Sequence, residues 1–301
     1  MGLQQKFPQF SETRPIFDGY YFGTIYKTSL ASNRSSKAVK METNGTECMR
    51  LSGKVAIVTG AAVGLGRAVA ARFAHEGASV VAADTNEKDG KALCDELQKE
   101  GLDAVFVKTD VSQECAVNAL FDGTLARYGH LDVLHNNAAV LLPDRDRPIH
   151  ELSTETWDFV MGVNLRGSFL CARRAVAAML QNGGGSIIFL GSPTGLVGCA
   201  PALTAYSASK AGIMGLTRVM AAAHARDKIR VNSIVPGTMD TPMNAYILAD
   251  AAVREKYSEA VPLGRLGTPS DIEGIALFLA SDESSYCTGG LYMCDGGLTA
   301  V

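Results

Sequence analysis

The sequence predicts one α/β domain built on a doubly wound, mostly parallel sheet with helices on both faces. From Lys54 onward, short apolar runs alternate with longer segments in which apolar residues recur at helical spacing. The apolar runs are continuous rather than alternating, which is typical of strands buried on both faces. Because one such pattern extends over residues 51–301, the chain needs no second folded domain.

The first half of this pattern begins with KVAIVTG, an uninterrupted apolar strand. The helical segment that follows it stops at Gly77, a residue type favoured just after a helix. The same alternation then repeats as far as a strand with a polar exit, in which His135 is interpreted as a satisfied core histidine. The predicted strands are 54–60, 78–84, 103–110 and 131–139, and the predicted helices are 65–77, 88–101 and 117–129.

The second half continues with one long helix from Thr156 to Leu180. Further on, Thr268, Pro269 and Asp271 are residue types favoured at the cap, first and third positions of a helix, so a helix begins there. The remaining predicted elements are strand 185–192, helix 206–225, strand 229–237 and a short closing strand at 291–297.

Composition excludes several classes of protein. The net charge of −3 and the pI near 6.0 provide no basic field for nucleic acid. Residues 175–209 carry no charge, but glycines and prolines interrupt them, so no membrane span is predicted. The seven cysteines are scattered without metal-ligand spacing, which indicates free thiols, a reducing compartment and no metal site. We therefore expect a cytoplasmic protein.

Residues 1–50 differ from the rest because they show no sustained helical or strand period and are rich in Ser, Thr and Asn. They lack the apolar core of a secretory signal, so we interpret them as a disordered leader. Their basic character leaves an organelle transit peptide open. Met41 and Met49 lie just before the regular pattern, so a later start of the chain is a third reading.

A glycine-rich turn, TGAAVGLG, connects the first strand to the first helix. Gly60, Gly64 and Gly66, with Leu65 between the last two, allow a sharp turn and a close approach of the backbone to a pyrophosphate. Tight strand–helix turns need glycine anyway, so the motif alone is weak. Asp84 strengthens it, because this carboxylate ends the second strand, 18 residues after Gly66, where it can accept hydrogen bonds from an adenosine ribose.

Asp84 also bears on the choice between NAD and NADP. A 2′-phosphate beside this carboxylate would be repelled by a few kcal/mol, even at an effective dielectric constant of about 20. Thr85 rather than an arginine follows Asp84, and Arg67 is the nearby cation that could accept NADP. The sequence favours NAD, with NADP as the alternative.

The segment AYSASKAG places Tyr206 and Lys210 one helical turn apart among small residues. An ammonium beside a phenol favours the phenolate, so we expect Lys210 to lower the pKa of Tyr206. Tyr206 is then a candidate proton donor and acceptor. Taken alone, the pair is more simply a packed tyrosine with a snorkelling lysine.

Together these motifs resemble the short-chain dehydrogenase/reductase family over Leu51–Val301. The matching motifs, in the order in which the family has them, are Thr59-Gly60 to Gly66, Asp84, Asp110-Val111, Asn136-Asn137-Ala138-Ala139, Asn164, Ser192, Tyr206 with Lys210, Pro236-Gly237 and Asp295-Gly296-Gly297. The resemblance implies a seven-stranded Rossmann sheet and nicotinamide-dependent interconversion of a secondary alcohol and a ketone. It also implies a homodimer or homotetramer, often built on the long helices containing Asn164 and Tyr206.

The resemblance also implies roles for individual residues. Tyr206 would be the general acid and base, Lys210 would lower its pKa and bind the nicotinamide ribose, Ser192 would bind the substrate oxygen, and Asn164 would hold a water in a proton relay. The implied contacts with the cofactor are Asp110 and Val111 with the adenine region, Asn137 near the ribose, and Thr241 with the nicotinamide carboxamide.

Two features depart from the family pattern. Ser192 lies fourteen residues before Tyr206 and Thr194 twelve, and neither equals the family's usual spacing. We favour Ser192 because strand 185–192 ends there, and leave Thr194 as the alternative. In addition, Ala139 stands where the family more often has glycine.

The sequence thus predicts an NAD-preferring oxidoreductase. An NADP-dependent reductase is one alternative, and a nucleotide-binding sensor without catalysis is another. An intact set of Tyr206, Lys210, Ser192 and Asn164 argues against the sensor, which would not need them. We expect residues 193–204 and 240–262 to shape an apolar substrate site, but the sequence leaves the substrate open.

Overall fold

The computed structural model describes residues 49–300, so the predicted leader lies outside the described residues except for its last two positions. Its centre is a seven-stranded sheet with the strand order β3-β2-β1-β4-β5-β6-β7, in which every pairing is parallel. This confirms the predicted doubly wound α/β class. The strands are β1 Val55–Thr59, β2 Ser79–Asp84, β3 Ala104–Lys108, β4 Val133–Asn136, β5 Gly185–Leu190, β6 Ile229–Pro236 and β7 Leu291–Cys294.

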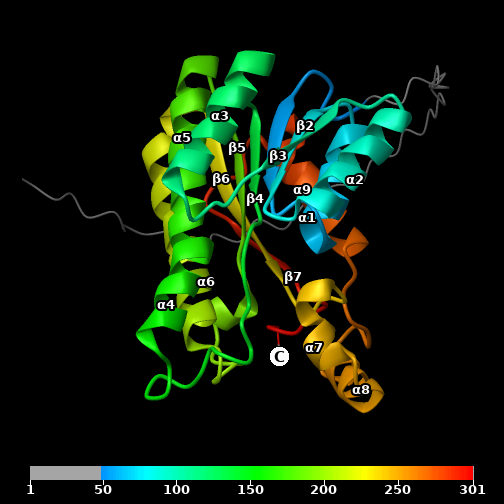
Figure 1. Ribbon diagram of the computed structural model, residues 1–301, viewed down its shortest axis with the longest axis vertical. Coiled ribbons are helices and arrows are strands. Elements are labelled where there is room, and N and C mark those ends of the chain that lie inside the picture. Colours follow the sequence, from blue (N-terminus) through cyan, green and yellow to red (C-terminus); the bar gives the residue numbers. More distant parts are fainter. Residues whose placement is uncertain (1–48, 301) are drawn as a thin grey trace, which may run out of the picture. The chain divides into compact units, whose positions relative to one another are not determined.

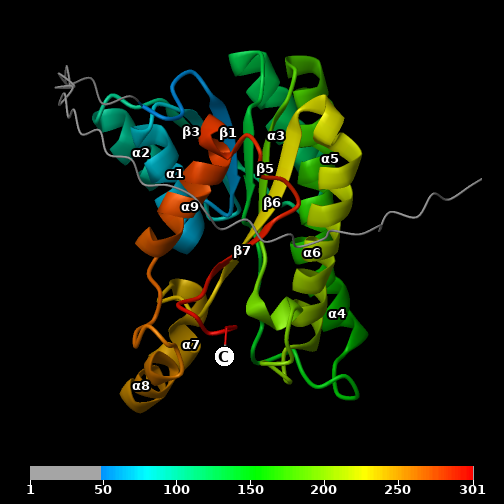
Figure 2. The same cartoon turned by 180° about the vertical axis from the view of Figure 1, so that it is seen from behind.

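Helices cover both faces of the sheet (Figures 1 and 2). One face packs against α1 Gly64–His75, α2 Glu87–Lys99 and α9 Ser270–Ala280, around Phe73 and Leu277. The other face packs against α3 Glu114–Tyr128, α5 Ser168–Asn182 and α6 Thr204–His224, around Phe121 and Phe189. Every residue of β1 and β4 is buried because both faces are covered, which explains why β1 reads as an apolar run.

The single long helix expected at 156–180 is interrupted. Helix α4 covers Thr154–Met161, a π-helical segment follows at Gly162–Gly167, and α5 then continues. Wide turns of this kind are rare and often lie at functional sites. One widened turn hardly changes the helical spacing of apolar residues over 25 positions. The sequence pattern therefore predicted one uninterrupted helix.

Two short helices, α7 Ala245–Leu248 and α8 Ala251–Glu259, were not predicted. They lie beyond the carboxyl ends of the strands, next to the ends of β6 and β7 (Figure 1). Asp250 caps α8 by accepting hydrogen bonds from the backbone N–H groups of Ala252 and Val253 at 2.8 and 3.1 Å. This pair of helices forms one wall above the sheet edge.

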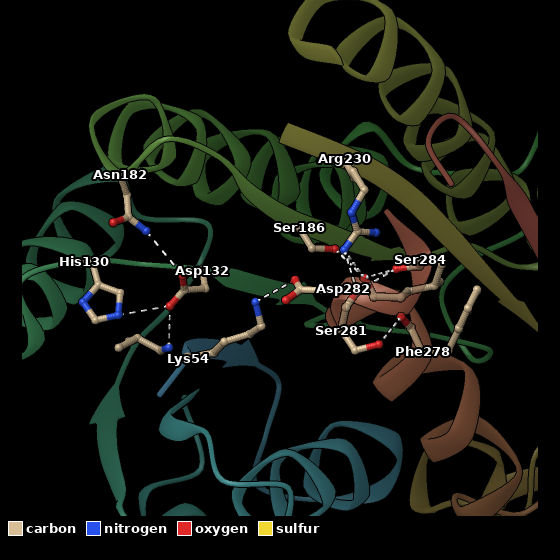
Figure 3. Close-up of polar contacts among 12 residues, drawn as sticks. Lys54, His130, Asp132, Asn182, Ser186, Arg230, Phe278, Ser281, Asp282 and Ser284 are labelled. Atoms are coloured by element: carbon tan, nitrogen blue, oxygen red, sulfur yellow. Dashed lines mark hydrogen bonds and ion pairs between the residues drawn. The ribbon is translucent and has the colours of Figure 1, made fainter. Parts of the chain in front are cut away.

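The opposite, amino edge of the sheet is closed by a polar network (Figure 3). The carbonyl oxygen of Leu279, near the end of α9, accepts hydrogen bonds from Ser186 at 2.7 Å, Arg230 at 2.9 Å and Ser284 at 3.1 Å. Nearby, Asp132 accepts the backbone N–H of Val55 at 2.8 Å, which ties the start of β1 to the start of β4. These contacts hold the amino ends of the strands in place. They do not involve the carboxyl ends of the strands.

His135 lies on β4 in the core, as expected, but it is not satisfied. The side chain is fully buried, it packs edge-on against Phe73, and neither ring nitrogen has a hydrogen-bond partner in the described part of the chain. Burial lowers the pKa of His135 to about 3, so the ring is neutral. It functions as an apolar filler.

Candidate active site

A cavity of about 630 Å³ lies at the carboxyl edge of the sheet, the edge at which open α/β sheets bind ligands. Its lining begins at the turn after β1, crosses the ends of β2, β4 and β5, and reaches α7 and α8. The candidate catalytic and cofactor-binding residues that line it are Gly60, Gly64, Leu65, Asp84, Asp110, Val111, Asn137, Ser192, Tyr206, Lys210 and Thr241. Gly66 and Asn164 do not line it.

The turn after β1 is a backbone cradle. Gly60 and Gly64 have φ values of +65° and +59°, in the left-handed region that favours glycine. A Cβ atom at Gly66 would lie 2.0 Å from the carbonyl oxygen of Gly60, so Gly66 allows α1 to start directly against the turn. The first turn of α1 contains no acidic residue, and its N-cap Val63 provides no side-chain hydrogen bond. The free N–H groups and the positive end of the helix dipole therefore suit a pyrophosphate.

Asp84 lies at the end of β2 and faces the same cavity. One carboxylate oxygen accepts the backbone N–H of Ala62 at 2.9 Å, and the other accepts that of Asn86 at 2.9 Å. These bonds fix the carboxylate beside the glycine turn. Each carboxylate oxygen has more than one lone pair, so both can still accept a hydroxyl hydrogen.

The expected adenine and ribose contacts gather around the same end. Asp110 accepts hydrogen bonds from the backbone N–H and the hydroxyl of Ser112 at 2.9 and 2.7 Å, which turns the chain after β3. Asn137 donates its amide to the carbonyl oxygens of Thr59 and Gly60, each at 3.0 Å. Asn137 therefore braces the glycine turn against the exit of β4.

The far end of the cavity brings hydroxyl groups together. Ser192, at the exit of β5, lies close enough to the hydroxyl of Tyr206 on α6 to act toward a lower pKa of that phenol. Thr194 donates its hydroxyl to Ser192 Oγ at 3.1 Å. This arrangement favours Ser192 over Thr194 as the hydroxyl next to Tyr206, because Ser192 and not Thr194 acts on the pKa of that phenol.

Lys210 lies one turn after Tyr206 on α6, as the spacing predicts. Its ammonium nitrogen is 5.5 Å from the centre of the Tyr206 ring and donates to the carbonyl oxygen of Leu190 at 2.8 Å. Only 3% of its surface is exposed. The two side chains are thus adjacent, but the ammonium points to the end of β5 rather than to the phenol oxygen.

The expected lowering of the Tyr206 pKa is not what the structure shows. Burial raises the pKa of Tyr206 to about 12, although the nearby hydroxyl of Ser192 acts in the opposite direction. Burial also lowers the pKa of Lys210 to about 8. Both shifts have one cause, since the surrounding protein replaces the water that would solvate either charge. The prediction considered the pair alone and left out this desolvation.

Replacing Lys210 with Met is expected to remove a pH-dependent part of the stability. The pKa of Lys210 is about 8 in the folded protein against 10.5 for a free lysine, so between these values the unfolded chain binds more protons. The free energy of unfolding should therefore rise with pH across this window in the wild type, by up to about 3 kcal/mol. Denaturant unfolding of the wild type and of Lys210→Met from pH 7 to 10 measures this pH dependence. If the free energy of unfolding changed with pH in the same way in both proteins, the lowered pKa of Lys210 would be contradicted.

Asn164 lies in the π-helical segment and is fully buried. Its Oδ1 accepts the backbone N–H of Val140 at 2.7 Å, and its Nδ2 donates to the Val140 carbonyl at 3.0 Å and to Ser209 Oγ at 3.2 Å. The side-chain amide thus clamps the exit of β4 to α6. These contacts use both ends of the side-chain amide, and Asn164 does not line the cavity. The side-chain geometry therefore does not show the role implied by the resemblance, in which Asn164 holds a water in a proton relay.

Asp146 is a positioning residue that the sequence analysis missed. It is fully buried, and its two carboxylate oxygens accept the backbone N–H groups of Ala205 at 3.0 Å and Tyr206 at 2.9 Å. Asp146 therefore caps α6 from a separate loop, 60 positions away in the chain. No local capping signal could have revealed it, because Leu203 occupies the N-cap position of α6.

The predicted substrate regions line the cavity through Cys199, Leu203 and residues of α7 and α8. A second group was missed: Val140, Leu141, Phe159, Val163 and Leu298. Phe159 and Val163 are four positions apart across the α4–π junction, a spacing that could have suggested a shared face. Within residues 49–300, no cluster of metal-ligating side chains occurs and no helix has the length and apolarity of a membrane-spanning one.

Known proteins resemble this chain over the same region. The family model described as enoyl-(acyl carrier protein) reductase matches residues 60–299. The chain is 40% identical over 255 residues to the 3-oxoacyl-(acyl-carrier-protein) reductase FabG of Thermotoga maritima, covering 83% of this chain and 99% of that protein. It is 41% identical over 248 residues to the cis-4-hydroxycyclohexanecarboxylate dehydrogenase of Sinomonas cyclohexanicum, covering 82% and 97%.

Solved structures give the same picture. A putative NAD(P)-dependent gluconate 5-dehydrogenase from Beutenbergia cavernae, with bound NADP, superposes with a TM-score of 0.79 at 35% identity, covering 84% of this chain and all of that one. The all-parallel sheet in the order β3-β2-β1-β4-β5-β6-β7 agrees with these similarities. This chain belongs to the short-chain dehydrogenase/reductase family and is an NAD(P)-dependent oxidoreductase that acts on CH–OH groups.

Proposed function

We propose that the protein transfers a hydride between NAD(H) and a secondary alcohol or its ketone, with Tyr206 as the general acid and base. The observation that carries this proposal is one cavity with two distinct ends: a glycine cradle with Asp84 at one, and the hydroxyls of Ser192 and Tyr206 beside Lys210 at the other. A dinucleotide could reach from the first to the second.

The chain's own residues would handle the proton. Ser192 can donate a hydrogen bond to the substrate oxygen, and Tyr206 can donate its proton to that oxygen as negative charge develops there. With a pKa of about 12, Tyr206 carries this proton at neutral pH. A bound nicotinamide would supply the hydride chemistry and, when oxidised, a positive charge. In the direction of oxidation the substrate alcohol must lose its proton. The positive charge of Lys210 would then add to that of the oxidised nicotinamide.

The preference for NAD rests on the charges at the cradle end. Asp84 is held there by two backbone N–H groups. Arg67, the cation that could have accepted a 2′-phosphate, does not line the cavity. Its guanidinium instead donates to the backbone carbonyl of Asp89 and pairs with Glu96 at 2.5 Å. Arg67 therefore does not offset the repulsion between the Asp84 carboxylate and the 2′-phosphate of NADP, which favours NAD.

Replacing Asp84 with Asn is expected to raise the ratio of kcat/KM for NADP to that for NAD by about tenfold, because the change removes repulsion of roughly 1.4 kcal/mol or more. Steady-state kinetics with both cofactors measure the ratio. Asp95→Asn, on the exposed face of α2, is the matched control and should leave the ratio unchanged. A wild type that prefers NADP would overturn the cofactor assignment.

The reaction itself is tested by following nicotinamide absorbance across a panel of secondary alcohols and ketones with NAD and NADP. We expect turnover that depends on Tyr206. A panel of linear, cyclic and polyhydroxylated compounds that yields no turnover with either cofactor would contradict the proposed reaction.

A further inference from the structure

The substrate end of the cavity is lined mainly by apolar side chains. Val140 and Leu141 contribute from the exit of β4, Leu203 from the start of α6, and Met243 and Ile247 from the α7 region. Apart from the hydroxyl groups at Ser192, Thr194 and Tyr206, the polar side chains on this wall are the uncharged Asn244, Tyr246 and Tyr257. Such a wall favours a ligand with mainly hydrocarbon surface and one oxygen directed at the hydroxyl group.

Positive charge from the lining residues of this end is limited to Lys210. Among the described residues that line the cavity, Lys210 is the only lysine or arginine, and no histidine lines it. Its ammonium already donates to the Leu190 carbonyl at the sheet edge, close to the ring of Tyr206. A charged group elsewhere on a substrate would therefore meet no counter-ion.

Neighbouring cations are engaged elsewhere. Arg254 on α8 makes a two-pronged ion pair with Asp240, at 2.7 and 3.1 Å. Arg147 donates to the backbone carbonyls of Pro143, Asp144 and Asp146. Both arginines are thus held by contacts within the protein and neither lines the cavity.

A carboxylate lies close to the mouth instead. The phenol of Tyr246, about half exposed on α7, has a raised pKa because of burial and the electrostatic influence of Tyr257 and Asp144. Asp144 is exposed in the loop after β4. The same loop is held against the start of α6 by the hydrogen bonds of Asp146, so a carboxylate on it would repel an anion entering between that loop and α7.

We propose that this enzyme acts on uncharged, mainly apolar secondary alcohols or ketones and rejects analogues that carry an ionised carboxylate or phosphate. The inference rests on the proposed function, because the Tyr206 end of the cavity must be the substrate end. Its physical basis is the high free-energy cost of moving an unpaired charge from water into an apolar site.

A matched pair of substrates tests this. 4-Oxocyclohexanecarboxylate and its methyl ester share the ring and the reacting ketone but differ in charge. At pH 7, kcat/KM with NADH is expected to be about a hundredfold higher for the ester. Equal values, or a preference for the acid, would overturn the proposal.

A gain-of-charge variant provides a second test. Met243 is 41% exposed and lines the mouth, so Met243→Arg should fold normally. It is expected to raise kcat/KM for the acid relative to the ester by about tenfold, whereas the neutral control Met243→Gln leaves the ratio unchanged. An unchanged ratio in the arginine variant would place the substrate's charged end outside this part of the cavity and contradict the proposal.

Binding separates this proposal from the proposed reaction. Calorimetry of the two compounds on wild-type protein saturated with NAD⁺ requires no turnover. Tighter binding of the ester in this complex, together with no reduction of either ketone in the separate assay with NADH, would refute the reaction and support the neutral-ligand site. Turnover of both compounds at equal efficiency would support the reaction and refute the neutral-ligand site.

Discussion

Replacing Tyr206 with Phe is expected to lower kcat for ketone reduction by about a thousandfold, because the reacting oxygen loses its proton donor. The substitution removes only the hydroxyl that lies near Ser192. The ring remains beside Lys210, so the affinity for NADH should change by less than about twofold. Stopped-flow kinetics and a fluorescence titration with NADH measure the two quantities.

Tyr128→Phe is the matched control, because this phenol lies on α3 and contacts Asp103 rather than the cavity. Its kcat should equal that of the wild type. Unchanged turnover in Tyr206→Phe would end the assignment of Tyr206 as the proton donor, and a parallel loss of NADH binding would point to a structural defect instead.

The pH profile provides a further readout of the same residue. Reduction needs the protonated phenol, and a pKa of about 12 keeps Tyr206 protonated, so kcat/KM for reduction should be flat across neutral pH. Oxidation needs the phenolate, so its rate should rise with pH, by about tenfold per unit below the pKa that applies in the complex. Equal pH profiles in both directions would contradict this assignment.

Replacing Gly66 with Ala is expected to destabilise the protein by about 3 kcal/mol and to weaken dinucleotide binding at least tenfold. The added Cβ would lie 2.0 Å from the Gly60 carbonyl oxygen and 2.6 Å from Nδ2 of Asn137. Both neighbours belong to the cradle, so neither can move without widening the turn. Denaturant unfolding and a titration with NADH test the two effects.

Gly123→Ala is the matched control, and we expect it to change the stability in the opposite direction to Gly66→Ala. Gly123 lies inside α3, and an added Cβ would meet nothing within 4 Å. Alanine should therefore stabilise the protein by up to about 1 kcal/mol and leave NADH binding unchanged. If Gly66→Ala behaved like Gly123→Ala, the cradle would not be as tightly built as the structure indicates.

Much of the fold could be read from the sequence because its determinants are local. Continuous apolar runs identified the buried strands, and Asp84 was placed correctly because a strand's end can be counted from its apolar residues. Gly60, Gly64 and Gly66 mark a strand–helix turn for steric reasons that involve only near neighbours in the chain. Residue spacing also identified Tyr206 and Lys210 as one face of a helix.

The missed features depend on distant parts of the chain. Asp146 caps α6 from another loop, and Asn164 clamps Val140, contacts that no local pattern contains. The sign of the Tyr206 pKa shift was wrong for the same reason. Its dominant cause is burial by surrounding elements, whereas the sequence displayed only the neighbouring lysine.

The widened turn at Gly162–Gly167 has a consequence for insertions and deletions. In a regular helix each residue advances the side-chain direction by about 100°. Losing one residue from this turn would rotate all of α5 by that angle relative to α4, so Cys171 and Met179, now fully buried against the sheet, would swing away from it. Homologous chains should therefore vary in length at surface loops but keep a constant residue count through this stretch.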